Sequence, residues 1–183
     1  MVITISGLGG TGKSTIAKRL AKKLDYKHYS AGDLQRELAK ERGLTITEWN
    51  IKEQADPKYD QMVDARLRQV GKNEKNIIID AWLAAHFVPH AIKIFLTGDI
   101  EERAKRITKK RESESFTKVE TAIKTTKLRE ETNQKRWLKF YNFDYLDKKN
   151  YDLVVDTTDL NEDEVFDKVY TYVKKQLQSP ARH

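Results

Sequence analysis

Residues 7–14 read Gly-Leu-Gly-Gly-Thr-Gly-Lys-Ser and match the pattern G-x-x-x-x-G-K-[ST] in full. Glycines at these positions let the backbone curl so that successive N–H groups point at phosphate oxygens. Lys13 can then reach the β and γ phosphates, and Ser14 can offer its hydroxyl to Mg²⁺. The flanking sequence fits this reading, because residues 2–5 form an apolar, β-rich run and residues 14–24 have helical spacing. The sequence therefore predicts a loop that binds a triphosphate.

A carboxylate follows the most apolar run of the chain. Residues 76–79 read Asn-Ile-Ile-Ile and lead directly to Asp80, as expected of a buried central strand. Ligands of open parallel sheets bind beyond the carboxyl ends of the strands. Asp80 can therefore hold Mg²⁺ directly or through water, or contact a phosphoryl acceptor. The structural alternative is that Asp80 caps a following helix.

Residues 30–33, Ser-Ala-Gly-Asp, together with Arg36 indicate a second anion site. Ser30 can cap the helix that follows, Asp33 lies in its first turn, and Arg36 lies one turn further on. A guanidinium at this place offers a bidentate grip on a second phosphate. Taken alone, Arg36 would be an ordinary surface residue, so the prediction depends on the phosphate loop beside it.

Five arginines form a third group of candidates. Arg129 and Arg136 are seven residues apart, so they project from one face of a helix. Converging guanidinium groups supply the charge stabilisation that phosphoryl transfer needs. The alternative is an exposed helix stabilised by pairs such as Glu131 with Lys135. The remaining three members of the group are Arg103, Arg106 and Arg111.

The chain reads as alternating strands and helices, which predicts an α/β domain with a largely parallel sheet. Thr47 is expected to cap a short helix, with Glu48 in its first turn. Polar residues at 112–115 are expected to interrupt a helix that starts near Asp99. Further strands are expected at 26–30, 91–96 and 151–156, and further helices at 34–41, 56–71, 117–141 and 161–176. Residues 179–183 are expected to form a frayed tail.

Composition narrows the class of protein. The 183 residues suffice for one domain; 34% of them are charged, and none is cysteine, which removes disulfides and thiolate chemistry. The short apolar runs and the lack of a leader predict a cytoplasmic protein without membrane spans. The net charge is +7, and residues 101–150 hold 15 Lys or Arg against 9 Asp or Glu. Such a basic region suits nucleic acid or a highly charged nucleotide.

The four histidines lack metal-ligand spacing and, like Trp49 and Trp137, are expected to pack or to lie at the surface.

Nearly the whole chain resembles the nucleoside monophosphate kinases, most closely the archaeal type of cytidylate kinase. The motifs that carry the resemblance are residues 7–14, 30–33 with Arg36 to Ala39, Lys40 to Gly43, Arg129 to Glu131 with Arg136, and Tyr151 to Val154. The resemblance implies one P-loop kinase domain, a three-layer α/β/α fold with a five-stranded parallel sheet in the order 2-3-1-4-5. It also implies a helical acceptor-binding region at 37–71 and a mobile lid at 108–135.

The resemblance implies roles for residues 7–14, Arg36, Arg129 and Arg136, and the motifs themselves suggest roles for the other candidates. Lys13, Asp80, Arg106, Arg129 and Arg136 would be catalytic, and Ser14 would hold Mg²⁺, with Asp80 near the metal through water. The acceptor would be bound by Ser30, Asp33, Arg36 and Trp82. ATP would be bound by Gly7, Leu8, Gly9, Gly10, Thr11, Gly12, Lys13, Ser14, Thr15, Arg103 and Arg111.

One segment departs from the family pattern. Where the family usually has an acidic residue, glycine and arginine, this chain has Asp80-Ala81-Trp82. The arginine that helps to hold the acceptor monophosphate is therefore absent, which weakens the preference for CMP over other acceptors. Trp82 can either stack on a base or fill space.

The leading interpretation is ATP-dependent phosphorylation of CMP or dCMP by a monomeric enzyme. The alternatives are an adenylate kinase or small-metabolite kinase, and, from another class, a nucleotide switch or a nucleic-acid-binding protein. A guanine-reading Asn-Lys-x-Asp motif is absent, since residues 73–76 read Asn-Glu-Lys-Asn, and no nucleic-acid-binding module is recognised. Small-molecule nucleotides are thus the expected partners.

Overall fold

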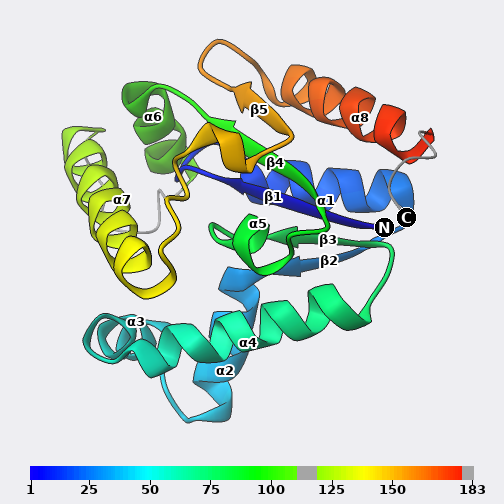
Figure 1. Ribbon diagram of the computed structural model, residues 1–183. Helices are drawn as coiled ribbons and strands as arrows, with labels where there is room; N and C mark the ends of the chain where they lie inside the picture. The colour runs from blue at the N-terminus through cyan, green and yellow to red at the C-terminus, as the bar shows by residue number, and fades with distance from the viewer. Residues whose placement is uncertain (111–118, 179–183) are drawn as a thin grey trace.

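The computed structural model describes residues 1–110 and 119–178 and contains a five-stranded parallel sheet with helices on both faces (Figure 1). The spatial order is β2-β3-β1-β4-β5, which confirms the expected order. The strands are β1 (Val2–Gly7), β2 (Lys27–Ser30), β3 (Ile77–Asp80), β4 (Ile92–Thr97) and β5 (Leu153–Asp156). β1 and β3 are fully buried, which explains their continuous apolar sequence.

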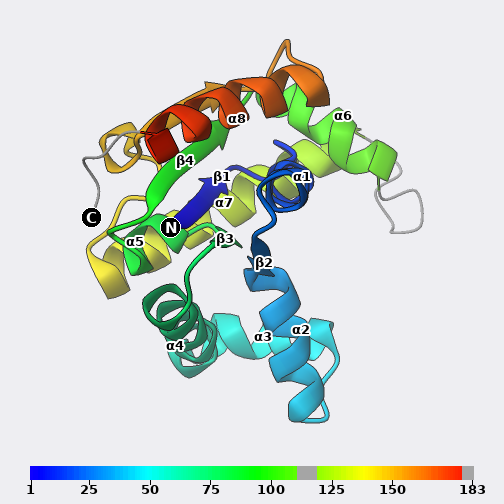
Figure 2. The same ribbon diagram turned by 90° about the vertical axis from the view of Figure 1, so that its right-hand side faces the viewer.

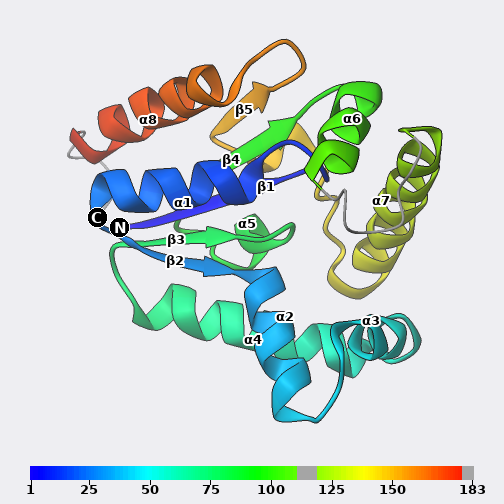
Figure 3. The same ribbon diagram turned by 180° about the vertical axis from the view of Figure 1, so that it is seen from behind.

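Two helices cover one face of the sheet. They are α1 (Lys13–Leu24) and α8 (Glu162–Gln178), which lie side by side in the view from behind (Figure 3). Apolar residues recur along both helices at the spacing of one helical face, and these residues are buried against the strands. Ile16 and Leu20 of α1 and Val169 of α8 pack there with Ile3 and Ile94 in one hydrophobic cluster.

The other face carries α5 (Ala84–Phe87), α4 (Pro57–Asn73) and the end of α7 (Val119–Tyr141). The helices α2 (Ala31–Glu41), α3 (Ile46–Ala55) and α4 project together below the β2 edge (Figure 2). Their apolar residues Leu34, Trp49 and Leu67 belong to the same buried cluster as Ile77 and Ile79 of the sheet. The helical region expected at 37–71 is therefore packed directly onto the sheet.

All five strands point the same way, so their carboxyl ends form one edge. Ser30 is in register with Asp80, and Ile5 is in register with the same residue from the other side. Helix α6 (Ile100–Lys110) follows β4 and packs against α7. A short 3₁₀ turn, η1 (Lys148–Asn150), precedes β5. Residues from distant parts of the sequence meet at this edge.

The start of α3 differs from the sequence-based expectation. Thr45, not Thr47, caps the helix: its hydroxyl accepts from the Glu48 N–H at 3.2 Å, and the Glu48 carboxylate accepts from the Thr45 N–H at 2.7 Å. This reciprocal pair is a capping box, whose spacing S/T-x-x-E only Thr45 satisfies. Thr47 is exposed within the first turn.

Substitution of the cap tests this assignment. We expect Thr45→Ala to lower the free energy of unfolding by about 1 kcal/mol, because two helix N-terminal N–H groups depend on the capping box. Thr47→Ala is the matched control and should change it by less than about 0.5 kcal/mol. Urea unfolding of both variants is the measurement. A larger loss of unfolding free energy in Thr47→Ala than in Thr45→Ala would show that Thr47 is the cap.

None of the helices described by the structure is both long enough and apolar enough to cross a membrane.

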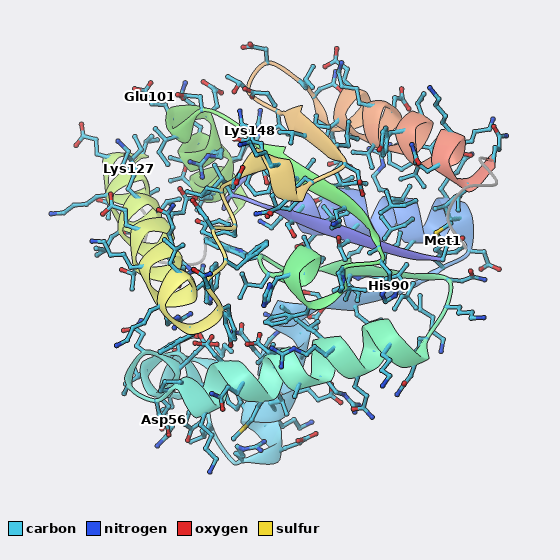
Figure 4. The ribbon with its side chains drawn as sticks, in the orientation of Figure 1. Met1, Asp56, His90, Glu101, Lys127 and Lys148 are labelled. Atoms are coloured by element: carbon cyan, nitrogen blue, oxygen red, sulfur yellow. The ribbon has the colours of Figure 1, made fainter. Side chains whose placement is uncertain are left out.

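Three labelled residues help to locate the helices in Figure 4. Glu101 lies at the start of α6, Lys127 on the outer side of α7, and Asp56 at the junction of α3 and α4. The interruption expected at 112–115, part of the lid expected at 108–135 and the tail at 179–183 lie outside the described residues.

Candidate active site

The loop between β1 and α1 has the backbone of a phosphate cradle. Gly7, Gly10 and Gly12 have φ values of +142°, +82° and +85°, a region that residues with side chains rarely adopt. A Cβ at Gly7 would collide with the carbonyl oxygen of Leu96, and one at Gly10 would lie 2.6 Å from that of Arg103. All three glycines are thus favoured by conformation, and Gly7 and Gly10 also by the close approach of neighbouring backbone.

Lys13 begins α1 and turns back over the loop. Its Nζ donates to the carbonyl oxygen of Leu8 at 2.8 Å, and the Thr11 hydroxyl donates to the same oxygen at 2.8 Å. Burial lowers the pKa of Lys13 to about 8, although the nearby Asp80 carboxylate opposes this shift. Burial thus disfavours the charged form of Lys13, and the Asp80 and Glu130 carboxylates offset part of that cost.

A cavity of about 580 Å³ adjoins the loop. Arg106 forms part of its wall and is fixed there, since it donates to the carbonyl oxygens of Thr157 and Thr158 at 2.7 and 3.0 Å. Arg106 thus lies beside the loop in the cavity wall, and its predicted catalytic role stays a prediction. The cavity is lined by Gly10, Thr11, Gly12, Lys13, Ser14, Thr15, Ile16, Arg106, Ile107, Thr157, Leu160, Asn161, Glu162 and Val165.

Arg103 is buried behind the loop. Its guanidinium donates to the carbonyl oxygens of Gly98 at 2.9 Å and Gly9 at 3.0 Å, and it pairs with Glu130 of α7 at 2.5 Å. Glu130 also accepts from the Gly9 N–H at 3.3 Å. The sequence predicted an ATP ligand at Arg103, but in this structure its guanidinium braces the loop from the inside. Glu130 was missed as a site residue; its place beside Arg129 was the available signal.

Asp80 lies at the centre of the edge and is 5% exposed. The alternative role as a helix cap is wrong, because α5 starts after Leu83 and has no side-chain cap. His28 of β2 places its Nε2 4.0 Å from the Asp80 carboxylate, and burial lowers the pKa of this histidine. A largely neutral His28 leaves the Asp80 charge available to Lys13 or to a metal ion.

Helix α2 carries the predicted acceptor residues. Ser30 occupies the N-cap position, but its side chain makes no cap hydrogen bond, so the expected capping by its hydroxyl is wrong. Arg36 donates to the Asp33 carboxylate, and both side chains are more than half exposed. The Arg36 guanidinium lies close to Gly32 and to the Ser30 hydroxyl region. The structure therefore gathers these residues at the start of α2, with Asp33 and Arg36 exposed and Ser30 half-buried.

Arg129 and Trp82 meet beside the loop. The Arg129 guanidinium carbon lies 5.4 Å from the centroid of the Trp82 ring, and Lys13 Nζ lies 5.6 Å from it. Trp82 also packs against Trp137 and Tyr145, with centroid distances of 5.5 and 5.4 Å. Trp82 is therefore next to the phosphate loop, and its predicted contact with the acceptor stays a prediction.

Arg136 lies two turns further along α7 and takes a different environment. Its Nε is 3.2 Å from the Asp60 carboxylate, and its guanidinium donates to the Glu53 carbonyl oxygen at 3.4 Å and to the Asn133 side chain at 3.2 Å. The structure thus places Arg129 at the loop and Arg136 against α3 and α4. Arg111 lies outside the described residues.

Two buried carboxyl groups of α4 face Arg136 and Tyr141. Burial raises the pKa of Asp64 to about 6, although a hydrogen bond from the Tyr141 hydroxyl opposes this, and burial also raises the pKa of Asp60. In unfolded chains the pKa of aspartate is about 3.9. Between pH 4 and pH 6 the folded protein therefore binds a proton at Asp64 that the unfolded chain has lost.

This difference sets a pH dependence of stability. The free energy of unfolding should fall as the pH rises from 4 to 7, because ionised Asp64 is disfavoured in the folded state. Asp64→Asn removes that cost, so the variant should gain about 2 kcal/mol over the wild type between pH 4 and pH 7. Urea unfolding across this range measures the difference; a constant difference between the two proteins would contradict the expectation.

The oxygen donors at the edge fit Mg²⁺. The Ser14 hydroxyl and the Asp80 carboxylate are the hard oxygen ligands that this ion prefers, supplemented by substrate phosphates and water. Among the described residues no group of three or more His, Cys, Asp or Glu is placed to hold a metal ion by itself. The donor set therefore suits an ion that arrives with a nucleotide.

Comparison with known proteins agrees with this geometry. The chain is 39% identical over 181 residues to cytidylate kinase from Sulfurisphaera tokodaii, with 97% of each chain covered. It is also 39% identical over 167 residues to cytidylate kinase from Thermococcus kodakarensis, with 91% of this chain and 84% of the relative covered. The crystal structure of shikimate kinase from Bacteroides thetaiotaomicron superposes with a TM-score of 0.69 at 14% identity, covering 98% and 99% of the two chains.

The structural likeness at 14% identity concerns the fold alone. The family comparison goes further, because residues 2–159 match the model of the cytidylate kinase-like family. That range includes the phosphate loop, the start of α2, Asp80 and helix α7. Together with the two relatives, this match shows that the chain belongs to the cytidylate kinase-like family.

Proposed function

We propose that the protein transfers the γ-phosphoryl group of ATP to CMP or dCMP, giving CDP or dCDP and ADP. The observation that carries the proposal is the meeting of Lys13, Asp80 and Arg129 at the sheet edge where α2 presents Asp33 and Arg36. Lys13, Asp80 and Arg129 would contact the donor, and Asp33 and Arg36 would contact the acceptor. The two relatives named cytidylate kinase support the choice of CMP.

The donor is bound by the phosphate loop and the adjoining cavity. Loop N–H groups and Lys13 hold the triphosphate, while the nucleoside lies in the cavity against Arg106. Ser14 and Asp80 would hold Mg²⁺, which neutralises charge on the outer phosphates when it is bound. Arg103 and Glu130 keep the loop in its binding conformation from behind.

The acceptor is held on the other side of the edge. Arg36 grips the non-transferring phosphate oxygens of the monophosphate, and Asp33 orients that guanidinium through their hydrogen bond. Helices α2 to α4 surround the nucleoside. In this region Arg136 of α7 pairs with Asp60 of α4. A phosphate oxygen of the acceptor thereby faces the γ-phosphorus of the donor.

The reaction needs little covalent help. An acceptor phosphate oxygen forms a bond to the γ-phosphorus while the bond to the β-γ bridging oxygen breaks, and ADP leaves. The acceptor phosphate is already a nucleophile near neutral pH, so no general base is required. Lys13 and Arg129 stabilise charge on the transferred group, and closure of the lid excludes water. The proposal includes a monomer that works in the cytoplasm on free nucleotides.

A coupled assay with ATP and Mg²⁺ tests the proposal. CMP, dCMP, UMP, AMP and the alcohol shikimate are supplied in turn, and CMP and dCMP should give the highest kcat/KM. Preference for AMP would make the protein an adenylate kinase, and preference for shikimate a small-metabolite kinase. Phosphorylation of none of them above background hydrolysis would overturn the proposal.

A further inference from the structure

Trp82 contacts two cations that come from distant parts of the sequence. Lys13 belongs to the phosphate loop and Arg129 to the lid helix α7, yet both lie within 6 Å of the Trp82 ring centroid. We infer that Trp82 is a positioning residue, whose ring holds Arg129 and Lys13 beside each other at the place where the phosphoryl group is transferred. The inference rests on the proposed function, because it concerns the rate of that transfer.

The ring itself is held firmly. Trp137 packs against it at 72° and Tyr145 at 36°, and these two rings contact each other at 5.1 Å. Trp137 and Tyr145 are 6% and 0% exposed, so the three rings form a rigid group that extends from the core to the site. A long, rotatable arginine or lysine side chain adjusts to such a fixed ring more readily than the ring adjusts to it.

Electrostatics explain why an aromatic ring is useful here. Arg129 and Lys13 carry like charges, and the proximity of Arg129 is one of the causes that lower the pKa of Lys13. The face of an indole is the most favourable aromatic surface for a cation. Trp82 therefore reduces the cost of bringing two cations together without neutralising either of them, as a carboxylate would.

The same contacts speak against the two roles considered from the sequence. A base stacked on Trp82 would compete with both cations for the ring. A residue that only filled space would have no reason to place its ring beside two charged groups of the site. Since Trp82 is partly exposed at the edge, its contacts with the cations exceed what packing requires.

Two substitutions separate these roles. We expect Trp82→Leu to lower kcat for CMP about tenfold while KM for ATP and KM for CMP stay within about twofold, because the cations lose their ring but the binding groups remain. Trp82→Phe keeps an aromatic ring that attracts cations less strongly, so its kcat for CMP should fall about threefold. Phe87→Leu is the matched control, since it removes a ring 4.3 Å from Arg68 at a distance from the site, and its kcat should be unchanged.

Each outcome is decisive. A rise in KM for CMP with unchanged kcat would overturn the inference in favour of base stacking. An unchanged kcat with a lower Tm would overturn it in favour of packing. If the wild-type protein phosphorylates none of the acceptors, the proposed function fails; an active wild type with an equally active Trp82→Leu variant overturns the role of Trp82 alone.

Discussion

Replacement of Lys13 by methionine is expected to lower kcat by about 10³-fold and to leave the protein folded. Lys13 is the lysine that we propose to bind the phosphates, and among the described side chains only Lys13 and the neutral Thr11 hydroxyl donate to the Leu8 carbonyl oxygen. Because burial lowers the pKa of Lys13 to about 8, its charge costs stability in the protein without nucleotide. Methionine has a similar length and no charge, so Tm should stay equal or rise.

A large loss of kcat together with an equal or higher Tm would separate a catalytic role of Lys13 from a structural one. Steady-state kinetics with ATP and CMP give kcat, and thermal unfolding without nucleotide gives Tm. Lys22→Met, on the exposed side of the last turn of α1, is the control and should leave both values unchanged. If Lys13→Met retained more than a tenth of the wild-type kcat, the lysine would not be part of the catalytic machinery.

The second large effect concerns the buried pair behind the loop. Arg103→Leu should lower the free energy of unfolding by about 3–5 kcal/mol, because it leaves the Glu130 carboxylate without its partner at 2.5 Å. The same change also removes the donors to the Gly9 and Gly98 carbonyl oxygens. We therefore expect the phosphate loop to loosen and KM for ATP to rise.

A double-mutant cycle isolates the pair. The variant with both Arg103→Leu and Glu130→Leu should recover part of the lost stability, since no unpaired buried charge remains. The exposed pair Lys105 with Glu102 on the same helix serves as the control, and Lys105→Ala should cost less than about 1 kcal/mol. Additive effects of the two leucine substitutions in urea unfolding would show that Arg103 and Glu130 do not act together.

Local sequence signals predicted the central features well. The phosphate loop, all five strands, their order and the position of Asp80 were expected, because each depends on a short motif, a continuous apolar run or the resemblance. The four-residue helix α5 was missed, since an apolar run as short as Leu83 to Val88 has no readable period. The cap at Thr45 could have been found from Glu48 three residues later.

Other features depend on contacts across the fold and left no local signal. Nothing near Arg103 in the sequence shows that it turns inward to Glu130, 27 residues away. Arg129 and Arg136 share a helical face pattern, yet one reaches the loop and the other reaches Asp60, because α7 spans both regions. The surroundings of Trp82 likewise depend on α7, whose Trp137 packs against the Trp82 ring from a distant part of the sequence.

The shared hydrophobic cluster of α2 to α4 and the sheet limits how this protein can be re-engineered. A module that can be transplanted between scaffolds has its own core. Here Trp49 is completely buried in the same cluster as Ile77 and Ile79, so helices α2 to α4 have no separate interior. Grafting residues 37–71 from a relative would open a void against β3 unless the matching sheet residues came with it. Acceptor preference is therefore better altered by single surface substitutions than by exchange of the segment.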